Sequence, residues 1–124
     1  MVDFRELTAT QLQGMFQREG VGINGFDYSW RRTKEWQPWS DDIAEQVRVA
    51  VAWLSLCEKT KTVNRRVGSY TLKHECEAWA GRYVSNGALL MAAWLLGFKI
   101  KQIAHGPNGW LNISNKGRPC RETL

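Results

Sequence analysis

The chain has 124 residues, of which 44% are hydrophobic, and its formal net charge is +5 at pH 7. This length suits one domain with one buried core, and this hydrophobic share is typical of a folded chain, which argues against intrinsic disorder. The unbroken apolar run from Ala88 to Leu96 is far shorter than the roughly 20 residues that span a bilayer, so we expect no transmembrane segment.

The cysteines and the N-terminal sequence bear on the cellular setting. The chain has three cysteines at scattered positions, Cys57, Cys76 and Cys120. An odd, scattered set argues against a disulfide framework, and no basic and apolar leader pattern follows Met1. These observations predict a protein of a reducing, cytoplasmic compartment.

A short helix and a long loop are expected before residue 40. Thr8 can cap the helix, and Gly20 can end it in the left-handed conformation. Residues 20–39 show no clear period and are rich in aromatic and basic side chains, which dominate protein interfaces. The alternative is that the large rings only pin a long loop to the core. The candidate protein-contact residues of this loop are Tyr28, Trp30, Arg31, Arg32 and Trp36.

Three further helices follow. Ser40 precedes two aspartates, which is a strong helix start because a hydroxyl caps the first turn and carboxylates favour the positive end of the helix dipole. Apolar residues at helical spacing extend this helix to about Cys57. A second helix is expected over 69–81. The third, over 86–96, is apolar on every side, which predicts a buried helix, and Gly97 closes it.

After the buried helix, the apolar pattern changes from helical to alternating. Residues 99–105 alternate polar and apolar side chains, which predicts a half-exposed strand. Residues 106–109 form a turn that contains Asn-Gly, the strongest short hairpin signal, and residues 110–114 are expected to be the return strand. The polar residues 115–124 are expected to fray.

Positive charge is concentrated in the second half of the chain. Residues 1–58 hold six Lys or Arg against nine Asp or Glu, whereas residues 59–124 hold eleven against three. This asymmetry favours a polyanionic partner such as DNA or RNA, although a solvated surface would also show it. The candidate nucleic-acid-binding residues are cations that would hold phosphates and one ring that would stack a base: Lys59, Lys61, Arg65, Arg66, Lys73, Lys99, Lys101 and Trp110.

The order of elements after residue 68 is similar to that of a winged helix-turn-helix: helix 69–81, helix 86–96 and hairpin 98–114. Such a domain places its second helix in the major groove. Here the second helix carries Leu, Met, Ala and Trp rather than the polar side chains that read base edges. We therefore expect the contact surface on the basic segments around it, with only Ser85 and Asn86 able to contact a phosphate or base.

Two arrangements of chemically active residues have alternative interpretations. His74 and Glu77 share one helix face and would suit a general base or an ordinary surface pair, and no known catalytic motif accompanies them. A zinc site from Cys57, Cys76, Cys120 and His74 lacks the usual Cys-x-x-Cys spacing. We expect a non-enzymatic protein with no catalytic residue, no metal and no cofactor.

A recurring pattern covers residues 62–114. It consists of Gly68-Ser69-Tyr70-Thr71-Leu72-Lys73-His74, Glu77, Tyr83-Val84-Ser85-Asn86-Gly87-Ala88, Gly97-Phe98 and Gly106-Pro107-Asn108. The pattern resembles small uncharacterised accessory proteins of phages and other bacterial mobile elements. The resemblance implies a bacterial host cell and an accessory role, since some such proteins bind nucleic acid and others block host defence machinery. It implies no catalytic residue.

Together these observations predict a single domain over 1–124, mainly α with a C-terminal β-hairpin (α+β). Four helices are expected around the buried helix 86–96, with winged-helix-like order in the C-terminal half. The expected function is non-enzymatic binding of DNA or RNA through a basic face, in the cytoplasm of a bacterial host cell and with no membrane contact. The alternative is an inhibitor of a bacterial defence system, similar to an anti-CRISPR protein, that acts by binding a host protein.

Overall fold

The apolar helix expected over 86–96 is the centre of the fold. In the computed structural model, which describes residues 8, 11, 14, 20–22, 24–26 and 41–120, this helix is α4 (Asn86–Leu95), and each residue from 86 to 93 is buried. The Ser85 hydroxyl caps it by accepting a 3.1 Å hydrogen bond from the Ala88 amide. Gly97 follows at φ +81°, a left-handed conformation that glycine adopts without strain.

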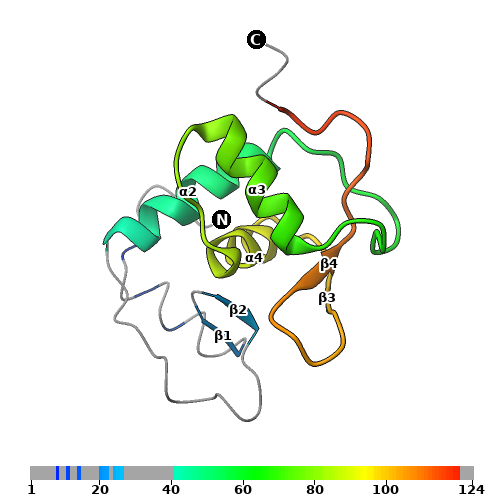
Figure 1. Ribbon diagram of the computed structural model, residues 1–124, viewed down its shortest axis with the longest axis horizontal. Helices are drawn as coiled ribbons and strands as arrows, with labels where there is room; N and C mark the ends of the chain where they lie inside the picture. Colours follow the sequence, from blue (N-terminus) through cyan, green and yellow to red (C-terminus); the bar gives the residue numbers. More distant parts are fainter. Residues whose placement is uncertain are drawn as a thin grey trace.

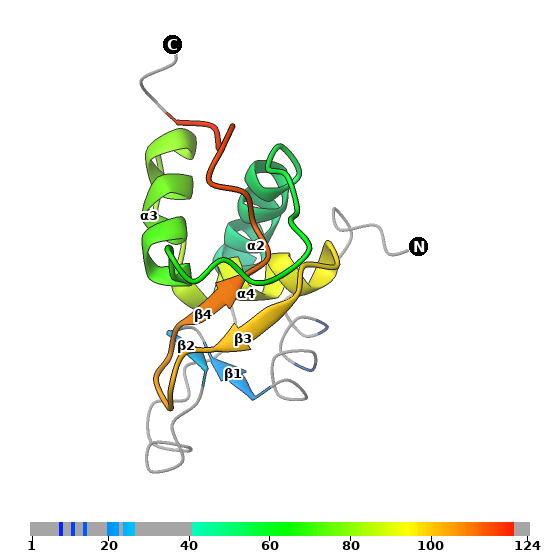
Figure 2. The same ribbon diagram turned by 90° about the vertical axis from the view of Figure 1, so that its right-hand side faces the viewer.

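The described part of the chain is an α+β fold that is mostly helical, as expected. Its other elements are α2 (Asp41–Leu54), α3 (Ser69–Ala80) and two antiparallel hairpins, β1 (Val21–Gly22) with β2 (Gly25–Phe26) and β3 (Ile100–Gln102) with β4 (Gly109–Leu111). Helices α2 and α3 lie on one side of α4, and the hairpins lie on the other (Figures 1 and 2). Within the described residues, no helix combines the length and apolar character that crossing a bilayer requires.

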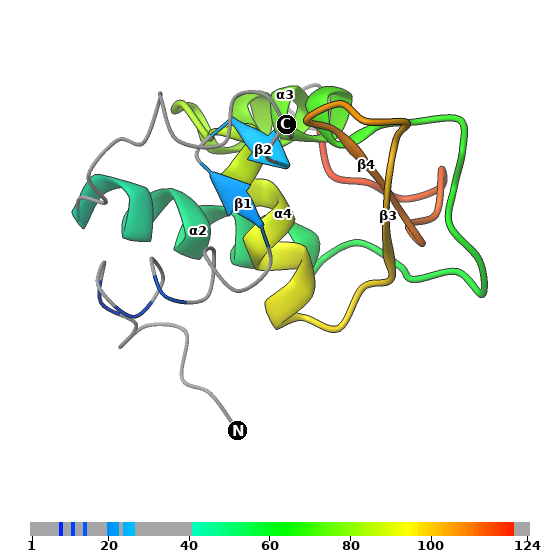
Figure 3. The ribbon, with the colours of Figure 1, turned by 90° about the horizontal axis from the view of Figure 1, so that it is seen from below.

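The apolar faces of α2 and α3 meet α4 in one core. The helical spacing of apolar residues in α2 places Val47, Ala50 and Leu54 in this core, and α3 contributes Leu72 and Cys76. Figure 3 shows α4 crossing α2. Because α4 is enclosed from several sides, its apolar character is explained by burial, and its first eight residues have no face free for a partner.

Strand β4 is the middle of three neighbouring segments of backbone that pair in antiparallel directions. On one side it pairs with β3, and Lys101 lies directly opposite Trp110. On the other side runs the basic connection 58–68, whose Thr60 and Asn64 amides donate to the carbonyls of Asn112 and Leu111 at 2.8 and 2.7 Å. The two segments that carry most of the predicted nucleic-acid-binding cations are therefore held next to each other by β4.

The β1–β2 hairpin, which the sequence interpretation missed, is joined to the rest of the fold by a close backbone approach. The Phe26 amide donates to the Pro107 carbonyl at 2.9 Å. Gly25 lies at φ +117°, and a Cβ at this position would be 2.1 Å from the Pro107 oxygen. Only glycine fits such an approach. The Asn24-Gly25 dipeptide lies at this hairpin, but Gly25 is a strand residue paired with Gly22 and not a central turn residue.

The β3–β4 turn differs from the expected one. The strands end at Gln102 and resume at Gly109, so a six-residue loop separates them and Asn108-Gly109 is not a tight two-residue turn. Gly109 belongs to β4 and is buried, and a Cβ there would be 3.0 Å from the Ile100 side chain and 3.1 Å from that of Phe26. This glycine permits close packing rather than a turn.

Residues 115–119, the described start of the tail that was expected to fray, contact the rest of the fold. The Trp53 indole donates to the Pro119 carbonyl at 3.1 Å, and the Arg118 guanidinium pairs with the Glu75 carboxylate at 2.8 Å. Of the helix expected over 8–20, only four residues are described, although the Thr8 hydroxyl does accept the Gln11 amide, as a cap would. The four-helix arrangement is thus not established.

Candidate nucleic-acid interface

The outer surface of the β3–β4 hairpin carries a cluster of cations around one tryptophan. We define the basic face as Lys61, Arg65, Lys99, Lys101 and Trp110. Lys99 and Lys101 are two residues apart and so point to the same side of their strand, and Trp110 lies opposite Lys101. The partner row supplies the other two cations: the Arg65 guanidinium lies 4.8 Å from the Trp110 ring, and the Lys99 ammonium donates to the Lys61 carbonyl at 3.0 Å.

The charge of the basic face is uncompensated within the described part of the chain. None of its four cations forms an ion pair there, whereas Arg48, Lys73, Arg82 and Arg118 all do. All four cations of the face are exposed, and Arg66 is exposed beside Arg65. Like charges gathered without counter-charges produce a positive potential that attracts a polyanion.

Two cations predicted for this interface have other roles. The Lys59 ammonium donates to the Leu96 carbonyl at 2.6 Å, where it lies against the negative end of the α4 dipole. The Lys73 side chain is only 8% exposed, and its ammonium pairs with the Glu77 carboxylate at 2.6 Å. Neither belongs to the basic face, although both are cations in the same half of the sequence.

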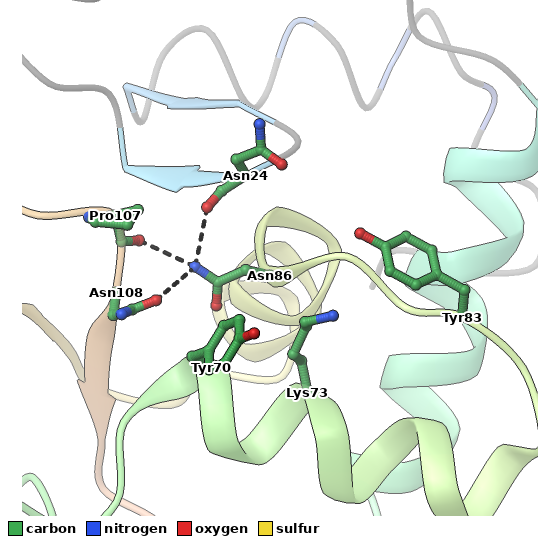
Figure 4. Close-up of a pocket in the computed structure, with 7 residues that line it drawn as sticks. All are labelled: Asn24, Tyr70, Lys73, Tyr83, Asn86, Pro107 and Asn108. Carbon is green, nitrogen blue, oxygen red and sulfur yellow. Dashed lines mark hydrogen bonds between the residues drawn. The ribbon is translucent and has the colours of Figure 1, made fainter.

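Lys73 lies in a cleft where segments distant in sequence meet. The cleft has a volume of about 510 Å³, and Figure 4 shows its lining side chains. The Lys73 ammonium lies 4.6 Å from the Tyr83 ring and 5.6 Å from the Tyr70 ring, a distance at which a cation is attracted to an aromatic face. The cleft is lined by Asn24, Tyr70, Lys73, Tyr83, Asn86, Pro107 and Asn108.

Asn86 joins the walls of this cleft. Its Nδ2 group donates to the Asn24 carbonyl at 3.1 Å, the Pro107 carbonyl at 3.2 Å and the Asn108 side-chain oxygen at 3.0 Å. Its Oδ1 atom is buried without a hydrogen-bond partner among the described residues, and it points toward Tyr70 and Lys73 (Figure 4). In the sequence, Asn86 is recognisable as a polar group at a helix start, whereas nothing in the pattern indicates Tyr70 or Tyr83 as site residues.

The structure places the residues of the two alternative sites, the His74–Glu77 pair and the cysteines considered as zinc ligands. The His74 Nδ1 atom does contact the Glu77 carboxylate at 3.2 Å, but that carboxylate also neutralises Lys73, and neither His74 nor Glu77 lines the cleft. The described residues hold no cluster of three metal-binding side chains. Burial raises the pKa of the Cys57 thiol to about 11 and that of Cys76 to about 12, so neither side chain is a reactive thiolate at neutral pH.

Of the seven tryptophans, four are described, and none of these is exposed; Trp53 is fully buried. The candidate protein-contact residues Tyr28, Trp30, Arg31, Arg32 and Trp36 lie outside the described residues.

Comparison with protein families, curated proteins and solved structures found no match to this chain.

Proposed function

We propose that this chain is a non-enzymatic accessory protein, of the kind carried by phages and mobile elements, that binds single-stranded DNA or RNA on its basic face. One observation carries the proposal: β4 holds two basic segments side by side around Trp110. Phosphates would lie over Lys61, Lys99 and Lys101, which are exposed and have no acidic partner among the described residues.

A base has a stacking surface on the same face. The Arg65 guanidinium covers the Trp110 ring at 4.8 Å, so a base would stack on the outer side of the Arg65 plane rather than directly on the indole. Guanidinium planes and aromatic rings both stack unpaired bases. Because every base has such a surface, this contact supports binding to many sequences.

Single strands suit the fold better than a duplex groove. The order of α3, α4 and the β3–β4 hairpin is similar to that of a winged helix. In such a domain, the second helix enters the DNA major groove, but here that helix would be α4, whose residues 86–93 are buried. Among the described helices, α4 therefore has no polar face with which to read base edges in a major groove. A basic strand pair with a stacked ring is instead the combination found in single-strand binders.

The test is the salt dependence of affinity for a fluorescent oligonucleotide. For single strands, the slope of log affinity against log salt is about −0.7 per phosphate contact, so the three contacts give about −2 and roughly a 20-fold loss between 50 and 200 mM salt. Lys101→Gln should weaken binding and make the slope less negative by about 0.7. Lys116→Gln removes the same charge from an exposed site outside the basic face and is the matched control.

Two results would overturn the proposal. One is the absence of binding to any DNA or RNA at the lower salt concentration. The other is an equal loss from Lys101→Gln and Lys116→Gln, which would mean that net charge alone, and not the basic face, holds the strand.

A further inference from the structure

We propose that the cleft beside the basic face takes one unpaired base of the bound strand, whose N–H or N–H₂ edge donates to the Asn86 Oδ1 atom. This inference rests on the proposed function and names a second, base-contacting part of the same site. Its starting point is the Asn86 side chain, which is 5% exposed and has a buried oxygen without a partner.

The orientation of the Asn86 amide is fixed by its surroundings. Three oxygens surround its Nδ2 group, and exchanging the two amide atoms would place an oxygen against all three. Oδ1 must therefore face the cleft, as Figure 4 shows. A buried acceptor without a donor is costly, so the complementary ligand group is an N–H or O–H. Phosphates and carboxylates, which only accept at neutral pH, do not satisfy it.

The walls of the cleft favour a flat, neutral ligand. Tyr70 and Tyr83 are 55% and 57% exposed, so both rings offer an accessible aromatic surface to a ligand. Between them, the charge of Lys73 is cancelled by Glu77, so net charge does not attract the ligand. The Lys73 ammonium has three protons and uses one for Glu77, which leaves a donor for an acceptor on the ligand edge. A ring with donor and acceptor atoms on its edge describes a nucleobase.

The start of β4 connects the cleft to the basic face along the chain. The Gly109 amide, at the start of β4, donates to the Ser69 hydroxyl at 3.0 Å, and Gly68 pairs with Trp110. Asn108 in the cleft is thus two residues from Trp110 on the basic face, a span of about 7 Å along a strand, or roughly two stacked nucleotides. The volume of the cleft, about 510 Å³, lies in the usual range for small-ligand sites.

The experiment measures the affinity of the full chain for oligothymidylate and for the same strand with N3-methylated thymines. The methyl group removes the only N–H of this base without changing the phosphates. We expect N3-methylation to weaken binding about tenfold, because it leaves the buried acceptor unpaired. Tyr70→Ala and Tyr83→Ala should each weaken binding of the unmodified strand about tenfold, the usual effect of losing one base–aromatic contact, with the salt slope unchanged.

Control variants separate the cleft from general effects. Tyr70→Phe keeps the ring and should bind as the parent does, and Leu56→Ala removes an exposed apolar side chain that does not line the cleft. Salt-dependent binding that neither N3-methylation nor the tyrosine variants weaken would overturn the cleft inference and leave the proposed function standing. If the tyrosine variants weaken binding but N3-methylation does not, the proposed hydrogen bond from the base to Asn86 is overturned. No binding of any strand would refute both.

Discussion

The pair of Lys73 and Glu77 makes a sharp prediction about stability. Glu77→Gln keeps the shape of the side chain but leaves the Lys73 ammonium, which is 8% exposed, without a counter-charge. Removing one partner of a fully buried pair costs about 3–5 kcal/mol. Glu77 is 20% exposed, and Gln can still accept one hydrogen bond, so we expect a lower figure of about 2 kcal/mol.

Replacing Lys73 should destabilise the fold less than replacing Glu77. Lys73→Met removes the charge and leaves Glu77 with the His74 imidazole and the Val84 amide as donors, so its cost should be about 1 kcal/mol. In the double variant neither charge remains to be compensated. Its stability should lie within about 1 kcal/mol of the parent, since apolar replacements of a buried ion pair are often nearly neutral.

The assay is urea denaturation of the parent, both single variants and the double variant. The expected coupling between the two sites is about 2 kcal/mol, and Glu77→Gln alone should lower the melting temperature by roughly 6–10 °C. Additive effects, with the double variant as unstable as the sum of the single variants, would refute the reasoning. That outcome would mean that the ammonium is solvated in the cleft despite its low exposure.

Two further predictions test the packing and the acid response. Gly25→Ala should destabilise the fold by about 2 kcal/mol or more, because its φ is +117° and its Cβ would meet backbone; Gly117→Ala, at φ +74° in open space, is the control and should cost less in thermal denaturation. Hydrogen bonds from Gln46 and Arg82 lower the pKa of Asp42 below 3.8. A carboxylate with a lowered pKa stabilises the fold at pH values above its pKa in the unfolded chain, and this stabilisation is lost as the pH falls through its pKa in the folded protein. Asp42→Asn should therefore make the free energy of unfolding depend less steeply on pH between about pH 5 and pH 2. An unchanged pH profile would contradict this.

The sequence predicted the helices well because their signals are local. Helical spacing identified α2 and α3, and the all-round apolar character of α4 predicted its burial. The serine cap before α4 and the glycine after it lie within one turn of the helix they end, so no distant contact is needed to recognise them. The predicted helix ends differ from the observed ones by three residues or fewer.

The two Asn-Gly dipeptides show where local signals fail. Asn108-Gly109 was interpreted as a tight turn, but Gly109 belongs to β4, and Gly25 of Asn24-Gly25 likewise belongs to a strand, where it pairs with Gly22. Both glycines are needed because another segment approaches them: the Pro107 carbonyl at Gly25, and the Ile100 and Phe26 side chains at Gly109. A glycine that permits a turn and one that permits close packing look the same in a sequence.

The candidate site could be predicted only in part for a related reason. The cations of residues 59–66 and 99–101 were recognised by composition, but their meeting across β4 depends on tertiary pairing. Lys73 has the same residue type as Lys101, and only the fold shows that one is paired with Glu77 and the other is exposed. The cleft draws Asn24, Asn86 and Asn108 from three distant segments, so no sequence spacing could reveal it.

The three-row arrangement around β4 places four like charges on one narrow surface without acidic partners in the described part of the chain. In the free protein these charges repel one another, and added salt screens that repulsion. The same salt competes with phosphates for the cations. Raising the ionic strength should therefore make this region more resistant to unfolding while it makes the protein a weaker binder, so that stability and affinity respond to salt with opposite signs.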